Sequence, residues 1–315
     1  MYFTQLPDNT VPGFDEQLHF SKFRKHNIIF NALSRQVHCD KHVGCLSIKT
    51  VLSGEEWYGI DNHRIAVRPG QFLILNDDQT YSCQIHSGER TRVLSVFFKK
   101  EFASSVFRDT LHGEATLLDD PFDKGKDTLE FFQTLHNIEP ELQGQLSSLV
   151  ADLDAQGYDS SLTDEYLVFI LRYLIQTHKK GLIDSRKVSA IKPGTKTEIY
   201  RRLCTAKDIL HSSYRDKLDL NAVSTMTCLS VPQLIRHFKS VFRVTPHRYL
   251  ISVRLRHAAE LLKQTRMPVH EITWQCGFEN VSAFCRAFKL EYGIQPDRFR
   301  RIACSNNDRG YSDLR

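Results

Sequence analysis

The sequence predicts an α+β protein with a strand-rich N-terminal part and an all-helical C-terminal domain. Short apolar segments separated by turn residues lie between residues 43 and 98, which is typical of an antiparallel barrel or sandwich. After about residue 126, the apolar residues recur at helical spacing. The chain has 315 residues, which is enough for about two domains.

The composition is that of an ordinary globular protein, with 41% hydrophobic and 25% charged residues. It excludes a disordered or collagen-like chain. No apolar run approaches the roughly 20 residues of a membrane helix, and the N-terminus lacks the pattern of a secretory signal. The eight cysteines form no Cys-x-x-Cys pair, so we expect free thiols and no zinc site. We therefore expect a cytoplasmic protein that does not enter a membrane.

The N-terminal strands are predicted from short apolar runs that end at turn residues. Asp61-Asn62-His63 and Pro69-Gly70 are two such turns. We expect residues 1–30 to be loop with a short strand. The predicted strands cover residues 43–51, 57–60, 64–67, 72–75, 81–85 and 93–98.

Helices are predicted over about 126–180. Leu129, Phe132 and Leu135 suit a first helix. Two more cover residues 142–153 and 162–180, and the last is predicted to start at a Ser161 cap and end at Gly181. Its apolar stripe is either core or a subunit interface, and the second alternative predicts a homodimer through residues 128–180. Further helices are predicted at about 197–211, 219–226, 231–242, 246–264, 268–275, 281–292 and 296–301.

Charge is distributed unevenly along the chain. Residues 195–303 contain 19 basic and 9 acidic residues, a net charge of +10, and the remainder has a net charge of −5. Such asymmetry indicates that the basic part binds a polyanion. We predict a sensor and dimerisation domain over 1–180, a linker over 181–196, a nucleic-acid-binding domain over 197–303 and a tail over 304–315.

The C-terminal domain contains an internal repeat with an offset of 50 residues. Each copy is predicted to be a helix-turn-helix, with Ser230 and Asn280 as caps of the second helices. The helix joining the copies, 246–264, would be about 28 Å long, close to one turn of B-DNA. The matched pairs include Leu234/Phe284, Arg236/Arg286, Phe238/Phe288, Lys239/Lys289, Pro246/Pro296 and Arg248/Arg298.

Residues 197–303 resemble the DNA-binding domain of the AraC/XylS transcription regulators. The resemblance is carried by residues 229–239, 254–262, 271–272, 277–278, 284–289 and 292–296. Residues 67–75 more weakly resemble the cupin-type sensor domain of that family, which implies a cupin-like barrel. Double-stranded DNA is the implied partner, with RNA polymerase as a further candidate.

The resemblance also implies roles for individual residues. Arg236 and Arg286 would read bases, since arginine can donate two hydrogen bonds to guanine. The other base-facing positions are Pro232, Ile235, Ser282 and Ala283, and the expected phosphate contacts are Lys239, Lys289, Arg248 and Arg298.

The chain departs from the family pattern at three positions. Ser224 and Thr273 replace alanine, and Arg243 replaces a glycine that the second copy keeps as Gly293. If Arg243 adopts a positive φ, its side chain makes that conformation costly.

The strand region shows no catalytic pattern. His38 and His42 are spaced as His-x-x-x-His, whereas a metal-binding cupin needs a compact His-x-His. We therefore expect no metal, no cofactor and no enzyme activity. Trp57, Tyr58 and Tyr81 are candidate pocket residues, although aromatic residues more often belong to a core.

These observations predict a sequence-specific transcription regulator, controlled by a small molecule or a protein partner at the N-terminal domain. Whether it activates or represses is left open. A metal-dependent cupin enzyme fused to a binding module is one alternative. An architectural DNA binder without a sensing role is the other.

Overall fold

The computed structural model describes residues 1–7, 16–61, 63–86, 90–111, 129–217 and 219–309. The chain divides into two compact units, Met1–Asp208 and Ile209–Arg315. The domain limits predicted above stay predictions.

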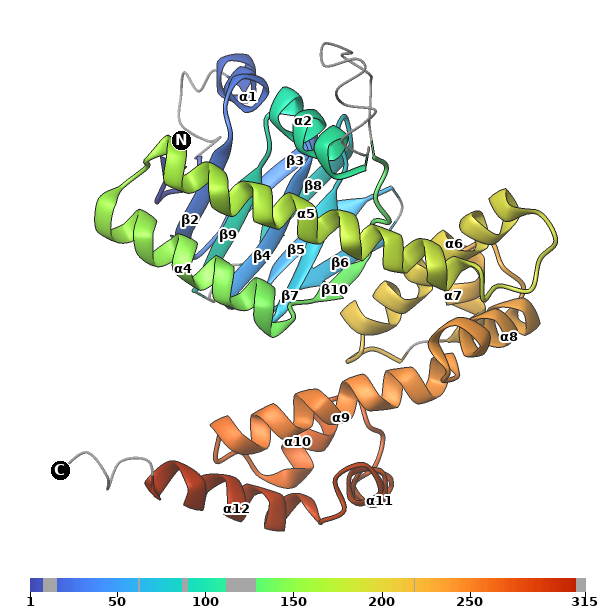
Figure 1. Cartoon of the computed structure of the whole chain (residues 1–315). Coiled ribbons are helices and arrows are strands. Elements are labelled where there is room, and N and C mark those ends of the chain that lie inside the picture. The colour runs from blue at the N-terminus through green and yellow to red at the C-terminus, as the bar shows by residue number, and fades with distance from the viewer. Residues whose placement is uncertain (8–15, 62, 87–89, 112–128, 218, 310–315) are drawn as a thin grey trace. The chain divides into compact units, whose positions relative to one another are not determined.

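The first unit contains two β-sheets (Figure 1). The six-stranded sheet has the order β1-β2-β9-β4-β7-β10, and the four-stranded sheet has the order β3-β8-β5-β6. All recorded strand pairs are antiparallel except β1 with β2. The strands are β1 (Tyr2–Phe3), β2 (Ile28–Ser34), β3 (Val37–Val43), β4 (Ser47–Ser53), β5 (Glu56–Ile60), β6 (His63–Val67), β7 (Gln71–Leu75), β8 (Thr80–Ile85), β9 (Thr91–Phe97) and β10 (Leu135–Asn137).

The predicted closed barrel is not what the described residues form. The two sheets keep separate hydrogen-bond ladders, with β1 and β10 at the edges of one and β3 and β6 at the edges of the other. The six predicted strand segments all contain strands. Three strands were not predicted: β2, β3 and β10. The polar residues of Val37–Val43, and Asn31 within Ile28–Ser34, interrupt the apolar pattern from which a strand is predicted.

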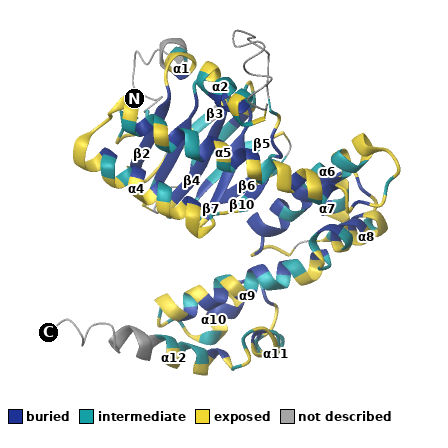
Figure 2. Ribbon diagram, in the orientation of Figure 1, coloured by how far each residue is buried: buried dark blue, intermediate teal, exposed yellow. Residues whose placement is uncertain are grey.

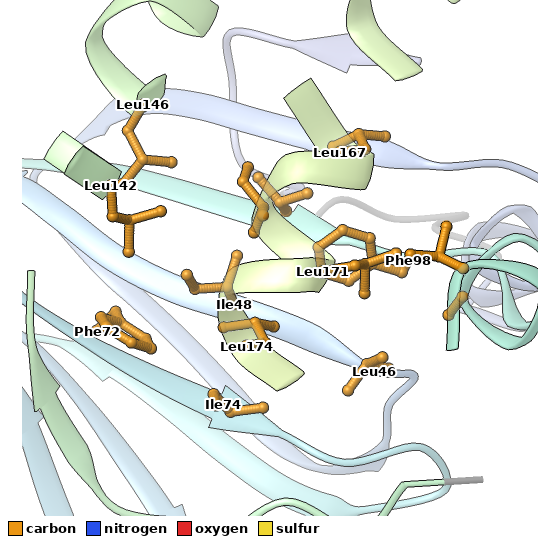
Figure 3. Close-up of a cluster of buried hydrophobic side chains, with 14 of the residues drawn as sticks. Leu46, Ile48, Phe72, Ile74, Phe98, Leu142, Leu146, Leu167, Leu171 and Leu174 are labelled. Atoms are coloured by element: carbon orange, nitrogen blue, oxygen red, sulfur yellow. The ribbon is translucent and has the colours of Figure 1, made fainter. Parts of the chain in front are cut away.

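Helices cover one face of the six-stranded sheet (Figure 1). Leu142 and Leu146 of α4, and Leu167, Leu171 and Leu174 of α5, lie over the side chains of the sheet (Figure 3). The apolar stripe of α5 is therefore core of its own chain. The helices of this unit are α1 (Glu16–Lys25), α2 (Lys100–Leu111), α4 (Pro140–Gln156), α5 (Ser160–Ser185) and α6 (Pro193–Ser212), which ends four residues into the second unit.

The segment around residue 132 corrects one prediction. No helix is present over 129–139, and Leu135–Asn137 instead pairs with β7 in the register Leu135↔Leu73. Phe131, Phe132 and Leu135 are buried although the segment is extended, and their spacing resembles that of a helix for this reason. Residues 126–128 lie outside the described residues.

Helix α5 also differs from its prediction at both ends. Its cap is Asp159, whose side chain accepts a hydrogen bond from Leu162 N at 2.9 Å. It continues through Gly181 to Ser185. A Cβ at Gly181 would lie 2.7 Å from the Phe132 ring, so glycine permits close packing here.

The second unit is helical, as predicted. A buried cluster joins Leu255, Ala258 and Leu262 of the long helix α9 to Phe284 and Phe288 of α11. Figure 2 shows buried residues along the inner faces of these helices. The elements are α7 (Leu220–Met226), α8 (Val231–Phe242), α9 (Pro246–Gln264), α10 (Val269–Gln275), α11 (Val281–Tyr292) and α12 (Pro296–Arg309). No described helix of either unit is both long and apolar enough to cross a membrane.

Candidate DNA-binding interface

The first helix-turn-helix consists of α7 and α8. Ser230 begins α8 with a reciprocal cap: its Oγ accepts from Gln233 N at 3.4 Å, and its own N donates to Gln233 Oε1 at 3.1 Å. Leu234 and Phe238 are fully buried. These contacts fix which face of α8 remains outside, and they confirm the predicted Ser230 cap.

The second helix-turn-helix, α10 and α11, repeats this construction. Asn280 Oδ1 accepts from Ala283 N at 2.7 Å, which confirms the second predicted cap. Phe284 and Phe288 are fully buried. In the turn, Gly277 has a φ of +76°, and a Cβ there would lie 2.8 Å from two backbone oxygens. Cys228, the equivalent residue of the first turn, has a φ of +50°, so both turns use the left-handed region, and only at Gly277 is a contact with these oxygens avoided by the absence of a Cβ.

The replacements of alanine at Ser224 and Thr273 are accommodated by backbone hydrogen bonds. The Ser224 hydroxyl donates to Leu229 O, and the Thr273 hydroxyl donates to Val269 O at 2.8 Å. Thr273 is fully buried, so this bond satisfies a hydroxyl that would otherwise be costly. Both turns also keep the same backbone bond, Leu229 N to Ser224 O and Phe278 N to Thr273 O.

Four cationic side chains lie on the outer faces of the second helices. Arg236 and Lys239 of α8 are exposed, as are Arg286 and Lys289 of α11. Within the described part of the chain, no acidic group forms an ion pair with any of the four. The Arg236 guanidinium lies 3.4 Å from His237 Nε2, and burial, followed by the Arg236 charge, lowers the pKa of His237. The repeat thus presents two equivalent unpaired cationic surfaces.

The remaining predicted DNA contacts differ in their surroundings. Pro232, Ile235 and Ser282 are exposed, whereas Ala283 is half-buried. Arg298 is exposed, but Arg248 pairs with Glu291 at 2.9 Å. That ion pair joins the first turn of α9 to the end of α11. This ion pair was not predicted, because the two residues are 43 positions apart in the chain.

Arg243 ends α8 in the left-handed region, with a φ of +63°. Its N–H donates to Lys239 O at 3.0 Å. Gly293 ends α11 in the same way, with a φ of +76° and the corresponding bond to Lys289 O. Arg243 therefore adopts the positive φ that was considered for it, and its side chain makes this conformation costly.

The first unit contains a cavity of about 790 Å³ between its two sheets. Tyr58 and Tyr81, two of the three candidate pocket residues, line it; that they contact a ligand stays a prediction. Trp57 does not: it is not among the lining residues, and it donates from Nε1 to Glu55 at 2.5 Å. Neighbouring residues of a strand face opposite ways, so Tyr58 and Trp57 could not both point inward. Lys49 and Glu56 also line the cavity and were not predicted.

The histidines and cysteines do not assemble a metal centre in the described part of the chain. Cys39 Sγ lies 3.3 Å from His42 Nδ1, and the Cys39 side chain is also hydrogen-bonded to Cys83, its register partner on β8. Burial raises the pKa of the Cys45 thiol to about 11, which keeps it protonated at neutral pH.

Comparisons with known proteins agree with this geometry. Residues 223–302 match a family model described as a helix-turn-helix domain. The chain is 26% identical over 180 residues to the probable transcriptional regulator LumQ of Photobacterium leiognathi, covering 57% of this chain and 68% of that one. It is 34% identical over 98 residues to the uncharacterized HTH-type transcriptional regulator YdiP of Escherichia coli K12, covering 30% and 32%.

Among solved structures, the chain is similar to the C-terminal domain of AraT, a response regulator from Geobacillus stearothermophilus. The identity is 28%, the coverage is 32% of this chain and 84% of that one, and the TM-score is 0.31. The matches to the curated relatives LumQ and YdiP span about two thirds and one third of their lengths.

The paired motifs and these similarities define the class: residues 223–302 form a helix-turn-helix domain, and the relatives that carry a similar domain are transcriptional regulators. Within that class, the matched domain and the relatives agree with the resemblance of residues 197–303 to the DNA-binding domain of the AraC-type regulators.

Proposed function

We propose that the protein binds an operator by placing α8 and α11 in the major groove, under the control of a small molecule held in the cavity of the first unit. In this proposal Arg236 and Arg286 contact bases. Lys239, Lys289 and Arg298 contact phosphates. Arg248, which was also predicted to contact phosphate, instead positions α11 through its ion pair with Glu291.

The observation that carries the DNA-binding proposal is the duplicated placement of arginine. Arg236 and Arg286 occupy equivalent positions on two helices whose caps and buried phenylalanines also correspond. Both guanidinium groups are exposed and lack an acidic partner among the described residues. A surface arginine without a function has no reason to be placed twice in this way. Because α9 packs against both motifs, their separation is fixed within the unit.

The test is substitution of Arg286 on a mapped site. Genome-wide mapping of bound DNA supplies the operator sequence. On that operator, Arg286→Ala should raise Kd by roughly five- to 150-fold, the equivalent of about 1–3 kcal/mol, and should relax the preference at one base pair. Lys289→Ala should weaken binding to all DNA sequences alike, and it should reduce the number of counterions released on binding by about one.

Arg266→Ala is the matched control, since Arg266 is an exposed arginine in the segment after α9. It should leave base preference unchanged. A uniform loss of affinity for Arg286→Ala, with no change of preference at any base pair, would favour an architectural binder instead.

The sensing part of the proposal requires that a ligand bind the two states of the protein with different affinity. It is measured as a change of operator affinity on titration of small molecules. The proposed homodimer is tested separately by sedimentation at micromolar concentration. Because the α5 stripe is occupied by its own sheet, a dimer would have to use other side chains of α4 and α5.

A further inference from the structure

Lys49 lies in the middle of β4 and faces the space between the two sheets. It is 3% exposed and pairs in register with Leu73 of β7 and Ser95 of β9. Its neighbour Ile48 belongs to the core beneath the helices, so the alternation of the strand directs Lys49 to the opposite face. There it lines the cavity together with residues of the four-stranded sheet.

The Lys49 ammonium has no polar partner among the described residues. No hydrogen bond or ion pair involves it there. Its Nζ lies 3.4 Å from the centroid of the Phe97 ring and 5.5 Å from that of Tyr81. Cation–π contacts of this kind offset only part of the cost of burying a charge. The buried Lys49 ammonium therefore faces the cavity without an acceptor.

The nearest buried acid does not supply that acceptor. Glu56 is 4% exposed, and its Oε2 accepts from the Tyr58 hydroxyl at 2.6 Å. It forms no ion pair with Lys49 among the described residues, and burial raises its pKa, which favours the uncharged form. The acidic residues at the rim do not reach the ammonium either, since Asp77 is paired with Lys100 at 2.5 Å.

Aromatic rings form two sides of the interior, and the polar residues that also line the cavity include Ser21, Arg24, His42, Ser95, Lys100 and Glu101. Phe23, Phe30 and Phe97 form a buried cluster on one side, and Phe23 packs edge-on against Phe97 at 4.6 Å between ring centroids. Tyr58 and Tyr81 belong to the cluster on the other side. A volume of about 790 Å³ lies within the range of sites for small organic ligands.

We propose that this cavity binds a monocarboxylate with an apolar or aromatic body, whose carboxylate accepts hydrogen bonds from the Lys49 ammonium. A carboxylate is the complement of a buried cation that lacks an acceptor, and charge-assisted bonds are the stronger ones. The body of the ligand would pack on the phenylalanine and tyrosine rings. The proposal names the class of ligand for the sensing site. Ligand binding itself does not depend on the proposed function; only the effect of the ligand on DNA binding rests on it.

The experiment compares acids with their neutral isosteres on the full-length protein. The probes are straight-chain acids from hexanoate to hexadecanoate and phenylalkanoic acids, each paired with its primary amide. Binding is measured by calorimetry and by ligand-observed NMR. At least one acid should bind at least tenfold more tightly than its amide at pH 7.

Variants then assign the difference to Lys49. Lys49→Met removes the charge at similar volume, and it should abolish the preference for the acid. Glu56→Gln retains an acceptor for Tyr58 and should keep the preference. Trp57→Phe, a change outside the cavity lining, is the matched control. Circular dichroism and thermal melting establish that each variant is folded.

A second readout uses the wild-type protein and remains decisive if Lys49→Met does not fold. Burial lowers the pKa of Lys49 to about 8, and the charged or titratable groups around it are Glu56, Cys39, Cys45 and Cys83. The affinity for the acid should therefore fall as pH is raised through 8, while that for the amide stays constant. Equal binding of acids and amides, or no Lys49-dependent binding in the whole series, would overturn the inference.

Failure of this inference and failure of the sensing function are distinguishable. If an acid binds through Lys49 but leaves operator affinity unchanged, the ligand assignment holds and the sensing role fails. If operator affinity responds only to molecules that bind independently of Lys49, the sensing role holds and the carboxylate assignment fails.

Discussion

At the scale of single residues, the C-terminal ends of α8 and α11 offer an internal comparison of backbone strain. Arg243 and Gly293 occupy equivalent positions with φ of +63° and +76°. Arg243→Gly should raise the free energy of unfolding by about 1 kcal/mol, because glycine adopts this conformation without a Cβ penalty. Gly293→Ala should lower it by a similar amount, since a Cβ there meets no atom within 4 Å and strain is its only cost. Urea unfolding measures both.

Arg243→Ala is the control, because it removes the charge but keeps the Cβ. A stabilisation by Arg243→Ala equal to that by Arg243→Gly would attribute the effect to charge and not to backbone conformation.

Asp208 offers a second residue-scale prediction. It is fully buried, and its carboxylate accepts from Thr134 Oγ1 at 3.0 Å and Leu135 N at 3.2 Å. Burial raises its pKa from 3.8 to about 7. Between those values the unfolded state is ionised while the folded state keeps its proton. The carboxyl therefore reduces stability as pH rises from about 4 to about 7, and this loss persists above pH 7.

Asp208→Asn removes that ionisation with little change of shape. Relative to wild type, the variant should gain stability over the same pH interval, by a few kcal/mol in total. Thermal unfolding of both proteins at several pH values measures the difference, which also cancels the contributions of other groups. A difference that does not vary with pH would show that Asp208 has an ordinary pKa in the folded protein.

At the scale of elements, the bounds that could be predicted are those set by residues close by in the sequence. The bounds of α8, α9 and α11 agree with their predictions because caps such as Ser230 and Asn280 lie within a few residues of the helices they start. The end of α5 could not be predicted, because Gly181 there serves a contact with Phe132, 49 positions away in the sequence. Strand β10 depends in the same way on its pairing with β7.

The candidate sites show the same division. The sequence indicated Arg236 and Arg286 because a repeat aligns them, and the structure leaves both exposed. Lys49 carried a weaker signal: a single charge in the buried run Ser47–Ser53. Its importance depends on which face of β4 is inward and on what the second sheet places opposite, and both are properties of the tertiary fold.

At the scale of the whole molecule, the uneven distribution of charge agrees with the two proposed functions, DNA binding and ligand binding. The basic residues are concentrated in the DNA-binding part, and the first unit encloses a cavity instead. DNA affinity should therefore depend steeply on salt, whereas ligand binding at the buried Lys49 should depend on it weakly. The two activities of the proposed regulator can thus be measured independently on one intact chain.

The last prediction concerns how the two motifs act together. Because α9 packs against both and Arg248 joins its first turn to α11, the recognition helices are held at a fixed separation. If both occupy major grooves of one operator, inserting about half a helical turn, roughly five base pairs, between their subsites should place the second subsite on the opposite side of the DNA.

Affinity should then fall to that of a single motif, and a competition assay on mapped operators measures it. An insertion of about ten base pairs should not restore it, because a rigid unit cannot extend by a full turn of about 34 Å. Unchanged affinity on the five-base-pair insertion would mean that only one motif contacts bases, and Arg236→Ala and Arg286→Ala on the same DNA would then identify which one.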